Sequence, residues 1–287
     1  NKNAKGRGTA CGVKNMNEKT AQFSLRGLFQ PRDLTEGTPW KTILAFALPI
    51  IISYLLQQVY TISDAAIVGQ TLTAGEVAGV NDTTSIIFIF LQFAFGVSAG
   101  FCVVTAAEVG AHHEAGVRRS LAAQILLSAA LTVLLTGLAL LLLKPMLAWI
   151  NVTPESPEVY RAAHTYCAII FAGIGAQLFY NFICSFLRSM GDSVTPLLFL
   201  LFSTILNIGL DLLFIVSFHW GVAGAAIATV AAQLISTVGC FLYAFVKYPK
   251  LRLHREDWQV TLGDMRRHLG QGIPLGLQFS VLAIGII

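Results

Sequence analysis

Residues 203–216 read STILNIGLDLLFIV, an apolar stretch that carries an asparagine and an aspartate four positions apart. In a helix, positions i and i+4 lie one turn apart on the same face, so Asn207 and Asp211 would project together. The stretch therefore predicts a helix whose apolar surface is interrupted by one polar face. Whether that face meets the protein core, lipid or a path for solute is the question on which the function depends.

The whole chain is far more apolar than a soluble protein of its size. Its 287 residues are 55% hydrophobic and 12% charged, and the mean hydropathy is +0.69. A soluble domain carries about 25% charged residues, whereas a helix that crosses a bilayer needs about 20 predominantly apolar residues. Several runs reach that length, so we expect an all-α polytopic membrane protein. The five cysteines lie far apart, without the spacing of a zinc site or a disulfide framework.

Six full spans and the start of a seventh are predicted. They cover 42–68, 84–107, 120–143, 165–187, 196–218 and 222–246, and the seventh begins at Ile273. This gives a polar basic N-terminal segment (1–38), a six-helix lobe (39–246), a cytoplasmic linker (247–272) and the truncated start of a second lobe (273–287). Pro49 and Pro274 stand before similar apolar patterns, as two six-helix halves would show. We expect the natural protein to be longer, with Met16 a candidate start.

The Lys and Arg residues predict the orientation. Of the 19, only Lys144 and Arg161 fall in loops on one side, and the other 17 lie in the N-terminal segment and the loops of the opposite side. Positive residues concentrate on the cytoplasmic side of membrane proteins, so the N-terminus is expected to be cytoplasmic. This distribution also explains the basic pI without a nucleic-acid partner.

Two acids, Asp64 and Asp211, lie well inside the predicted spans. An acid at the centre of a membrane helix costs about 2.5–3.5 kcal/mol and marks a cavity or a partner. At a rise of 1.5 Å per residue, both acids and Thr229 lie at similar depth in the outer half of the bilayer, and Tyr60 and Asn207 lie one turn away. These oxygens would suit a monovalent cation such as Na⁺, or the acids would exchange protons. Hydrogen bonding between helices is the structural alternative.

Other polar side chains inside the spans are candidates for lining a cavity. They are Gln57, Gln92, Gln177 and Asn181, and each suits an interhelical hydrogen bond equally well. The six histidines fall in loops or near span ends, so the sequence indicates no catalytic residue, no metal site apart from Na⁺ and no cofactor.

Four pieces of sequence carry a family resemblance. The first is P-x(14)-D-x(3)-VG, from Pro49 through Asp64 to Val68-Gly69. The second and third are the inner loops EVGAHHEAGVRRS and LRSMGDSVTP, and the fourth is N-x(3)-D in span five followed by Thr229. In this order and spacing, from about Pro39 to Ile287, they resemble the multidrug and toxic compound extrusion (MATE) family of secondary transporters.

The resemblance implies an exporter of twelve helices in two lobes, of which this chain holds the N-terminal lobe and the start of the second. Such a protein couples inward Na⁺ or H⁺ flow to the export of cationic amphiphilic compounds across a bacterial cytoplasmic membrane, by alternating access. It is a transporter and not an enzyme. By position, the cation site of this lobe falls on Asp64, Asn207, Asp211 and Thr229, with Tyr60 close by. Its partners would be the substrates, the lipid bilayer and the C-terminal lobe.

Two other functions fit parts of the pattern. A lipid-linked saccharide or metabolite flippase of related architecture would need more cationic residues in its central cavity than the spans offer. An intramembrane aspartyl protease also uses two aspartates on different helices, but it requires Tyr-Asp and Gly-x-Gly-Asp sequences. The two aspartates stand here in TISDAA and NIGLDLL.

Overall fold

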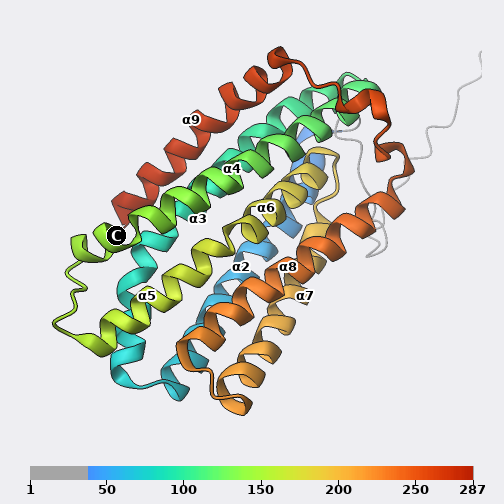
Figure 1. Ribbon diagram of the computed structural model, residues 1–287. Helices are drawn as coiled ribbons and strands as arrows, with labels where there is room; N and C mark the ends of the chain where they lie inside the picture. The colour runs from blue at the N-terminus through green and yellow to red at the C-terminus, as the bar shows by residue number, and fades with distance from the viewer. Residues whose placement is uncertain (1–37, 287) are drawn as a thin grey trace, which may run out of the picture.

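The computed structural model describes residues 38–286, so the expectations for the segment before Thr38 fall outside it. Within this range the chain forms helices and no strand (Figure 1). The α-helices are α2 (Pro39–Thr71), α3 (Ala74–Gly110), α4 (Glu114–Trp149), α5 (Pro157–Ala172), α6 (Ile174–Ser189), α7 (Val194–Asp211), α8 (Gly221–Lys247) and α9 (Leu262–Ile286). A π-helix, η1 (Leu212–Ser217), continues α7, and two 3₁₀ turns, η2 (Pro249–Leu251) and η3 (Arg255–Trp258), precede α9.

The expected all-α membrane fold is confirmed. In the described part of the chain, α2, α3, α4, α7 with η1, α8 and α9 are each long and apolar enough to cross a membrane, and α5 with α6 forms one further, bent crossing. Several helices begin well before the predicted spans: α3 begins at Ala74 instead of 84 and α5 at Pro157 instead of 165. The largest difference is that α9 begins at Leu262 instead of near Ile273. Thr261 and Asp264 cap each other there, with hydrogen bonds of 2.7–3.2 Å. Much of the predicted linker is therefore helical.

The fourth crossing is broken, which the sequence did not predict. Helices α5 and α6 meet at an angle of 45° around Gly173. A Cβ atom at this position would lie 2.4 Å from the Val230 side chain of α8. Glycine therefore lets α8 approach the broken point closely, and any larger residue would push these helices apart.

The fifth crossing changes its winding directly after Asp211. Helix α7 ends at this residue, and η1 carries the chain onward as a π-helix. A π-helical turn is rare and is often found at a functional site. The acid therefore lies at the one point of this crossing where the winding changes.

The helices pack around α3, which contacts α4, α5, α6 and α9. Figure 1 shows α9 running along α3 and α4 on one side of the bundle, with α7 and α8 on the other. Large apolar side chains of the core, among them Phe101, Phe171 and Phe182, are fully buried. Helix α2 packs mainly against α7, and only 11% of its central span is buried, the lowest share among the described spans. It is therefore the crossing that the rest of the bundle holds least.

Candidate functional site

Asp64 of α2 and Asp211 of α7 lie next to each other across the packing between these helices. Their carboxyl groups are close enough to interact directly. Asp211 is completely buried and Asp64 is half-buried. No described group of the protein donates a hydrogen bond to either oxygen of Asp211 or to Oδ1 of Asp64. Two adjacent acids in an apolar interior thus lack the donors that would normally stabilise them.

The other predicted site residues join this pair. Asn207 lies one turn before Asp211 on the same face of α7, fully buried, and neither its amide nitrogen nor its oxygen has a partner among the described residues. The Thr229 hydroxyl of α8 is also buried without a partner in the hydrogen-bond geometry, although it lies close to the Tyr60 hydroxyl. Three helices thus bring together the residues that the sequence placed at one depth.

The number of unsatisfied atoms is what distinguishes this place. Buried polar atoms in proteins are almost always hydrogen-bonded, and each unmet group costs about 1–3 kcal/mol. If these side chains served only to join helices, they would hydrogen-bond to one another. Instead, buried polar atoms of Asp64, Asn207, Asp211 and Thr229 have no hydrogen-bond partner among the described residues. Two carboxylates, an amide oxygen and a hydroxyl form the donor set that a hard monovalent cation prefers, and two adjacent acids suit a shared proton equally well. The residues present therefore fit Na⁺ or H⁺.

A cavity of about 180 Å³ lies beside the acids. Asp64, Tyr60 and Thr229 line it, as do Gln57 and Gln177, which the sequence had proposed as cavity residues. Gln92 and Asn181 are not in its lining, and Asn181 instead accepts a hydrogen bond of 3.4 Å from Gln177. Asn207 and Asp211 are also outside the lining, in keeping with their complete burial.

Sequence reasoning missed Tyr166 and Gln233, which both line this cavity. Tyr166 of α5 lies near Asp64, Asp211 and Tyr60. The depth argument missed Tyr166 because the predicted fourth span begins at 165, whereas α5 begins at Pro157, so that Tyr166 lies well inside the crossing. Gln233 is one turn from Thr229 on α8, and its oxygen accepts a weak hydrogen bond of 3.4 Å from Ser203.

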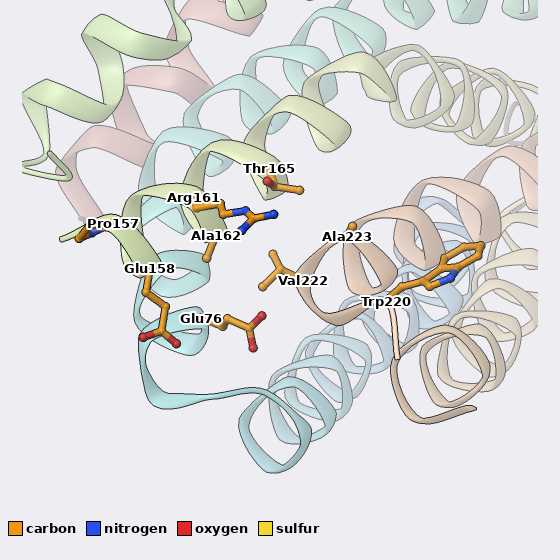
Figure 2. Close-up of a pocket in the computed structure, with 9 residues that line it drawn as sticks. All are labelled: Glu76, Pro157, Glu158, Arg161, Ala162, Thr165, Trp220, Val222 and Ala223. Atoms are coloured by element: carbon orange, nitrogen blue, oxygen red, sulfur yellow. The ribbon is translucent and has the colours of Figure 1, made fainter. Parts of the chain in front are cut away.

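A second, larger cavity opens at the end of the bundle where α3, α5 and α8 begin. Figure 2 shows its lining, with Glu76 and Glu158 on one side and Trp220 on the other, and its volume is about 580 Å³. Glu158 accepts a hydrogen bond of 2.6 Å from Thr73, the residue that caps α3. An apolar cluster of Val80, Ala162 and Val222 lies at this end, and Tyr166 packs against it.

The two inner-loop motifs have a structural explanation. In LRSMGDSVTP, Asp192 caps α7 and joins it to the end of α8, because it accepts hydrogen bonds from Thr195, from Lys247 at 2.9 Å and from Tyr248 at 2.7 Å. Burial alone would raise the pKa of Asp192, but these hydrogen bonds outweigh it and hold the pKa below its usual value. In EVGAHHEAGVRRS, Glu108 bonds His113 at 2.8 Å. These residues fasten helix ends and lie outside the acid site.

Comparison with known proteins agrees with this fold. The family model described as MatE matches residues 49–213, more than half of the chain. The "Probable multidrug resistance protein YpnP" of Bacillus subtilis is 31% identical over 89% of this chain and 56% of its own length. The "Probable multidrug resistance protein NorM" of Thermotoga maritima is 25% identical over 86% of this chain and 53% of its own length. The chain thus spans about half the length of the curated relatives it matches.

A solved structure gives the same result for the fold. It is described as the outward-facing conformation of a multidrug resistance MATE family transporter of the MOP superfamily, and it matches with a TM-score of 0.79 at 24% identity. The match covers 87% of this chain and 55% of that one. The helices described above therefore have the arrangement found in about half of a transporter of this kind.

Proposed function

The chain belongs to the MatE family of multi-pass membrane proteins, and from this premise we propose that it forms the first lobe of a cation-coupled exporter of cationic amphiphilic compounds. The coupling ion is Na⁺ or H⁺, and the movement is alternating access. The single observation that carries the proposal is the buried pair of acids, Asp64 and Asp211, whose oxygens lack donors while Asn207 and Thr229 stand unsatisfied beside them.

The charge of this pair supplies a coupling mechanism. Two unit negative charges about 4 Å apart repel each other by about 4 kcal/mol at an effective dielectric constant of about 20. A bound cation or proton removes this repulsion and draws α2 towards α7. Because α2 is the least buried crossing, it is the helix that such a change moves most easily. A shift of α2 alters the cavity that Gln57 and Tyr60 line, and so links ion binding to drug release.

The chemistry of the cavity beside the acids supports a cationic substrate. Its lining includes the carboxyl group of Asp64 and the rings of Tyr60 and Tyr166, and it includes no Lys or Arg. A cation is attracted both by a carboxylate and by the face of an aromatic ring. A flippase for anionic lipid-linked saccharides would need the opposite charge here, so we rank it second.

The positive charges support a cytoplasmic N-terminus in a cell membrane. The α3–α4 turn, the α6–α7 turn and residues 248–261 lie at one end of the bundle, and the basic loop residues are concentrated there. By the positive-inside rule this end faces the cytoplasm. The acid site then lies nearer the outer surface.

Efflux of a fluorescent cationic dye tests the proposal. Cells would express the natural gene product that contains this chain, as wild type, as Asp211→Asn and as Asp82→Asn, under separate Na⁺ and pH gradients. Asp82 is an exposed acid on α3 and serves as the matched control. We expect gradient-driven efflux in the wild type and in Asp82→Asn, and its loss in Asp211→Asn. Undiminished ion-dependent efflux by well-expressed Asp211→Asn protein would refute the assignment.

A further inference from the structure

A second buried polar cluster lies far from the acids, near the α3–α4 turn. It consists of Thr105 of α3, Ser120 and Gln124 of α4, and His268 of α9, each at most 3% exposed. Such burial is unusual for four polar side chains, and the cluster joins α9 to two helices of the predicted first lobe. We define these four residues as the inner cluster.

The hydrogen bonds of the inner cluster form a chain in which each donor and acceptor can be followed from His268 to Thr105. Nδ1 of His268 lies 2.8 Å from the backbone oxygen of Asp264, which only accepts, so Nδ1 carries the proton. When the ring is neutral, the opposite nitrogen, Nε2, accepts from the Ser120 hydroxyl at 2.8 Å. Ser120 has thereby used its proton, so Thr105 donates to it at 2.8 Å. This order of donors and acceptors belongs to a neutral His268 ring.

Gln124 completes the cluster. Its amide nitrogen donates to the hydroxyl groups of Thr105 and Ser120, and its oxygen accepts a weak bond of 3.3 Å from the Cys102 thiol. Every side-chain donor and acceptor of the inner cluster is then used. This is the reverse of the acid site, where the atoms stand unpaired. A fully satisfied buried network holds its helices in one arrangement, so α9 has a defined position against α3 and α4.

Two glycine pairs bring α3 and α9 into direct backbone contact beside the inner cluster. A Cβ atom on Gly96 would lie 2.7 Å from the Leu275 oxygen, and one on Gly100 would lie 2.6 Å from the Gln271 oxygen. On the facing helix, Gly272 and Gly276 are equally close to α3. Gly-x₃-Gly on both partners permits the close approach typical of membrane helix pairs.

Ion pairs surround the inner cluster at the end of the bundle. Arg267 of α9 reaches Glu108 of α3 at 3.4 Å, and Arg118 of α4 reaches Asp257 of η3 at 3.2 Å. Arg267 is exposed and Glu108 is partly exposed, so their ion pair contributes less than about 1 kcal/mol. The buried hydrogen bonds and the glycine contacts therefore hold α9 in place more strongly than the charges do.

We propose that the inner cluster is the latch that closes the cytoplasmic side of the transporter. Helix α9 starts the predicted second lobe, whereas α3 and α4 belong to the first, so the Ser120–His268 bond holds the inner ends of the two lobes together. The latch releases once in each transport cycle, when the cytoplasmic side opens. The inference rests on the proposed function, because a latch between lobes acts only in alternating access.

A reporter cysteine at Val97 makes the latch visible. Val97 is 1% exposed and lies under Gly272 and Gly276 of α9, so a thiol there is reached only when α9 leaves. The Val97→Cys chain would carry Ala at the native cysteines, apart from Cys102→Ser, which keeps the donor to Gln124. A water-soluble maleimide applied to inside-out membrane vesicles then measures the rate of opening.

We compare this chain with three further variants. His268→Ala removes the central hydrogen bonds, Gly100→Ala forces α3 from α9, and Gly270→Ala is the control because a Cβ there meets nothing within 4 Å. Loss of one buried hydrogen bond corresponds to about a 10-fold change in an opening equilibrium. We therefore expect labelling about 10-fold faster in His268→Ala and in Gly100→Ala, and unchanged labelling in Gly270→Ala.

The same reporter is then followed during transport. Supplying a cationic dye and an ion gradient should accelerate the labelling of Val97→Cys as the cycle runs. Efflux that proceeds with unchanged labelling refutes the latch alone, as does equal labelling of all four folded chains. Absence of efflux from the wild type refutes the proposed function and the gating role with it.

Discussion

Replacing Asp211 by asparagine should make the ion-free protein more stable while it removes the response to the coupling ion. The acid is completely buried beside Asp64, and neither of its oxygens receives a hydrogen bond from a described residue. Asp211→Asn removes one of two adjacent charges and offers an N–H that can donate to Oδ1 of Asp64. If Asp211 instead stabilised the fold through hydrogen bonds, its replacement would break those bonds and lower the stability of the ion-free protein.

The size of the effect follows from two contributions. Repulsion between two unit negative charges about 4 Å apart is about 4 kcal/mol at an effective dielectric constant of about 20, and the pair relieves part of it by taking up a proton. The new hydrogen bond contributes about 1 kcal/mol. We expect a net gain of about 1–3 kcal/mol in the free energy of unfolding without ion, which raises Tm by several degrees.

Thermal unfolding of the purified protein in detergent measures both parts. An ion that binds only the folded state stabilises it by about 2.7 kcal/mol at 100 times its Kd. The wild type should therefore gain stability when Na⁺ replaces choline, or when the pH is lowered if H⁺ is the coupling ion, and Asp211→Asn should gain almost none. The exposed-acid control Asp82→Asn should behave as the wild type. Lower stability of Asp211→Asn without ion, together with an intact ion response, would refute the reasoning.

Three further changes test other parts of the structure. Asp192→Asn should lower the free energy of unfolding by about 2–4 kcal/mol, because buried charge-assisted hydrogen bonds from Lys247 and Tyr248 are lost. Folding lowers the pKa of Asp192, so the stability that this carboxylate contributes is present above the ordinary carboxyl pKa of about 3.9 and is lost as the pH falls below it. Acid unfolding curves of the wild type and the variant measure this difference. Tyr166→Phe should leave Tm within about 2 °C but weaken efflux about 10-fold, measured as dye transport, if the hydroxyl contacts the ion or drug. Gly173→Val should lower Tm and efflux together, because its side chain meets Val230, whereas Gly137→Val on α4, which meets nothing within 4 Å, should change neither.

The sequence predicted the membrane fold and the acid site for the same physical reason. A bilayer imposes a fixed thickness, so residue number converts to depth, and the helices run nearly side by side. Residues at equal depth are then candidates for contact, and in the structure Asp64 lies next to Asp211 and lines one cavity together with Thr229. Depth does not give rotation about the helix axis, which is why Gln92 and Asn181, equally plausible by sequence, lie outside the cavity lining.

The break in the fourth crossing could not be predicted from local sequence. Gly173 stands in the stretch FAGIGAQ, where nothing distinguishes it from Gly175 two positions later. The bend depends on where α8 lies, because only Gly173 meets Val230, and that contact joins residues far apart in the chain. The capping box that starts α9, in contrast, is visible in the sequence as Thr261 followed by Asp264, although the apolar run that indicates a membrane span begins only later.

The inner cluster and the acid site are both buried and polar, but the first is fully hydrogen-bonded and the second is not. This difference indicates a separate role for each. The inner cluster uses every donor and acceptor on neighbouring protein groups, so it has nothing to offer a ligand and instead joins α9 to α3 and α4. The acid site leaves oxygens of Asp64 and Asp211 unpaired in an interior where each unmet group is costly. Under the proposed function, an ion that enters the site recovers this energy, and a binding energy that is available only when the ion is present is what a coupled transporter needs.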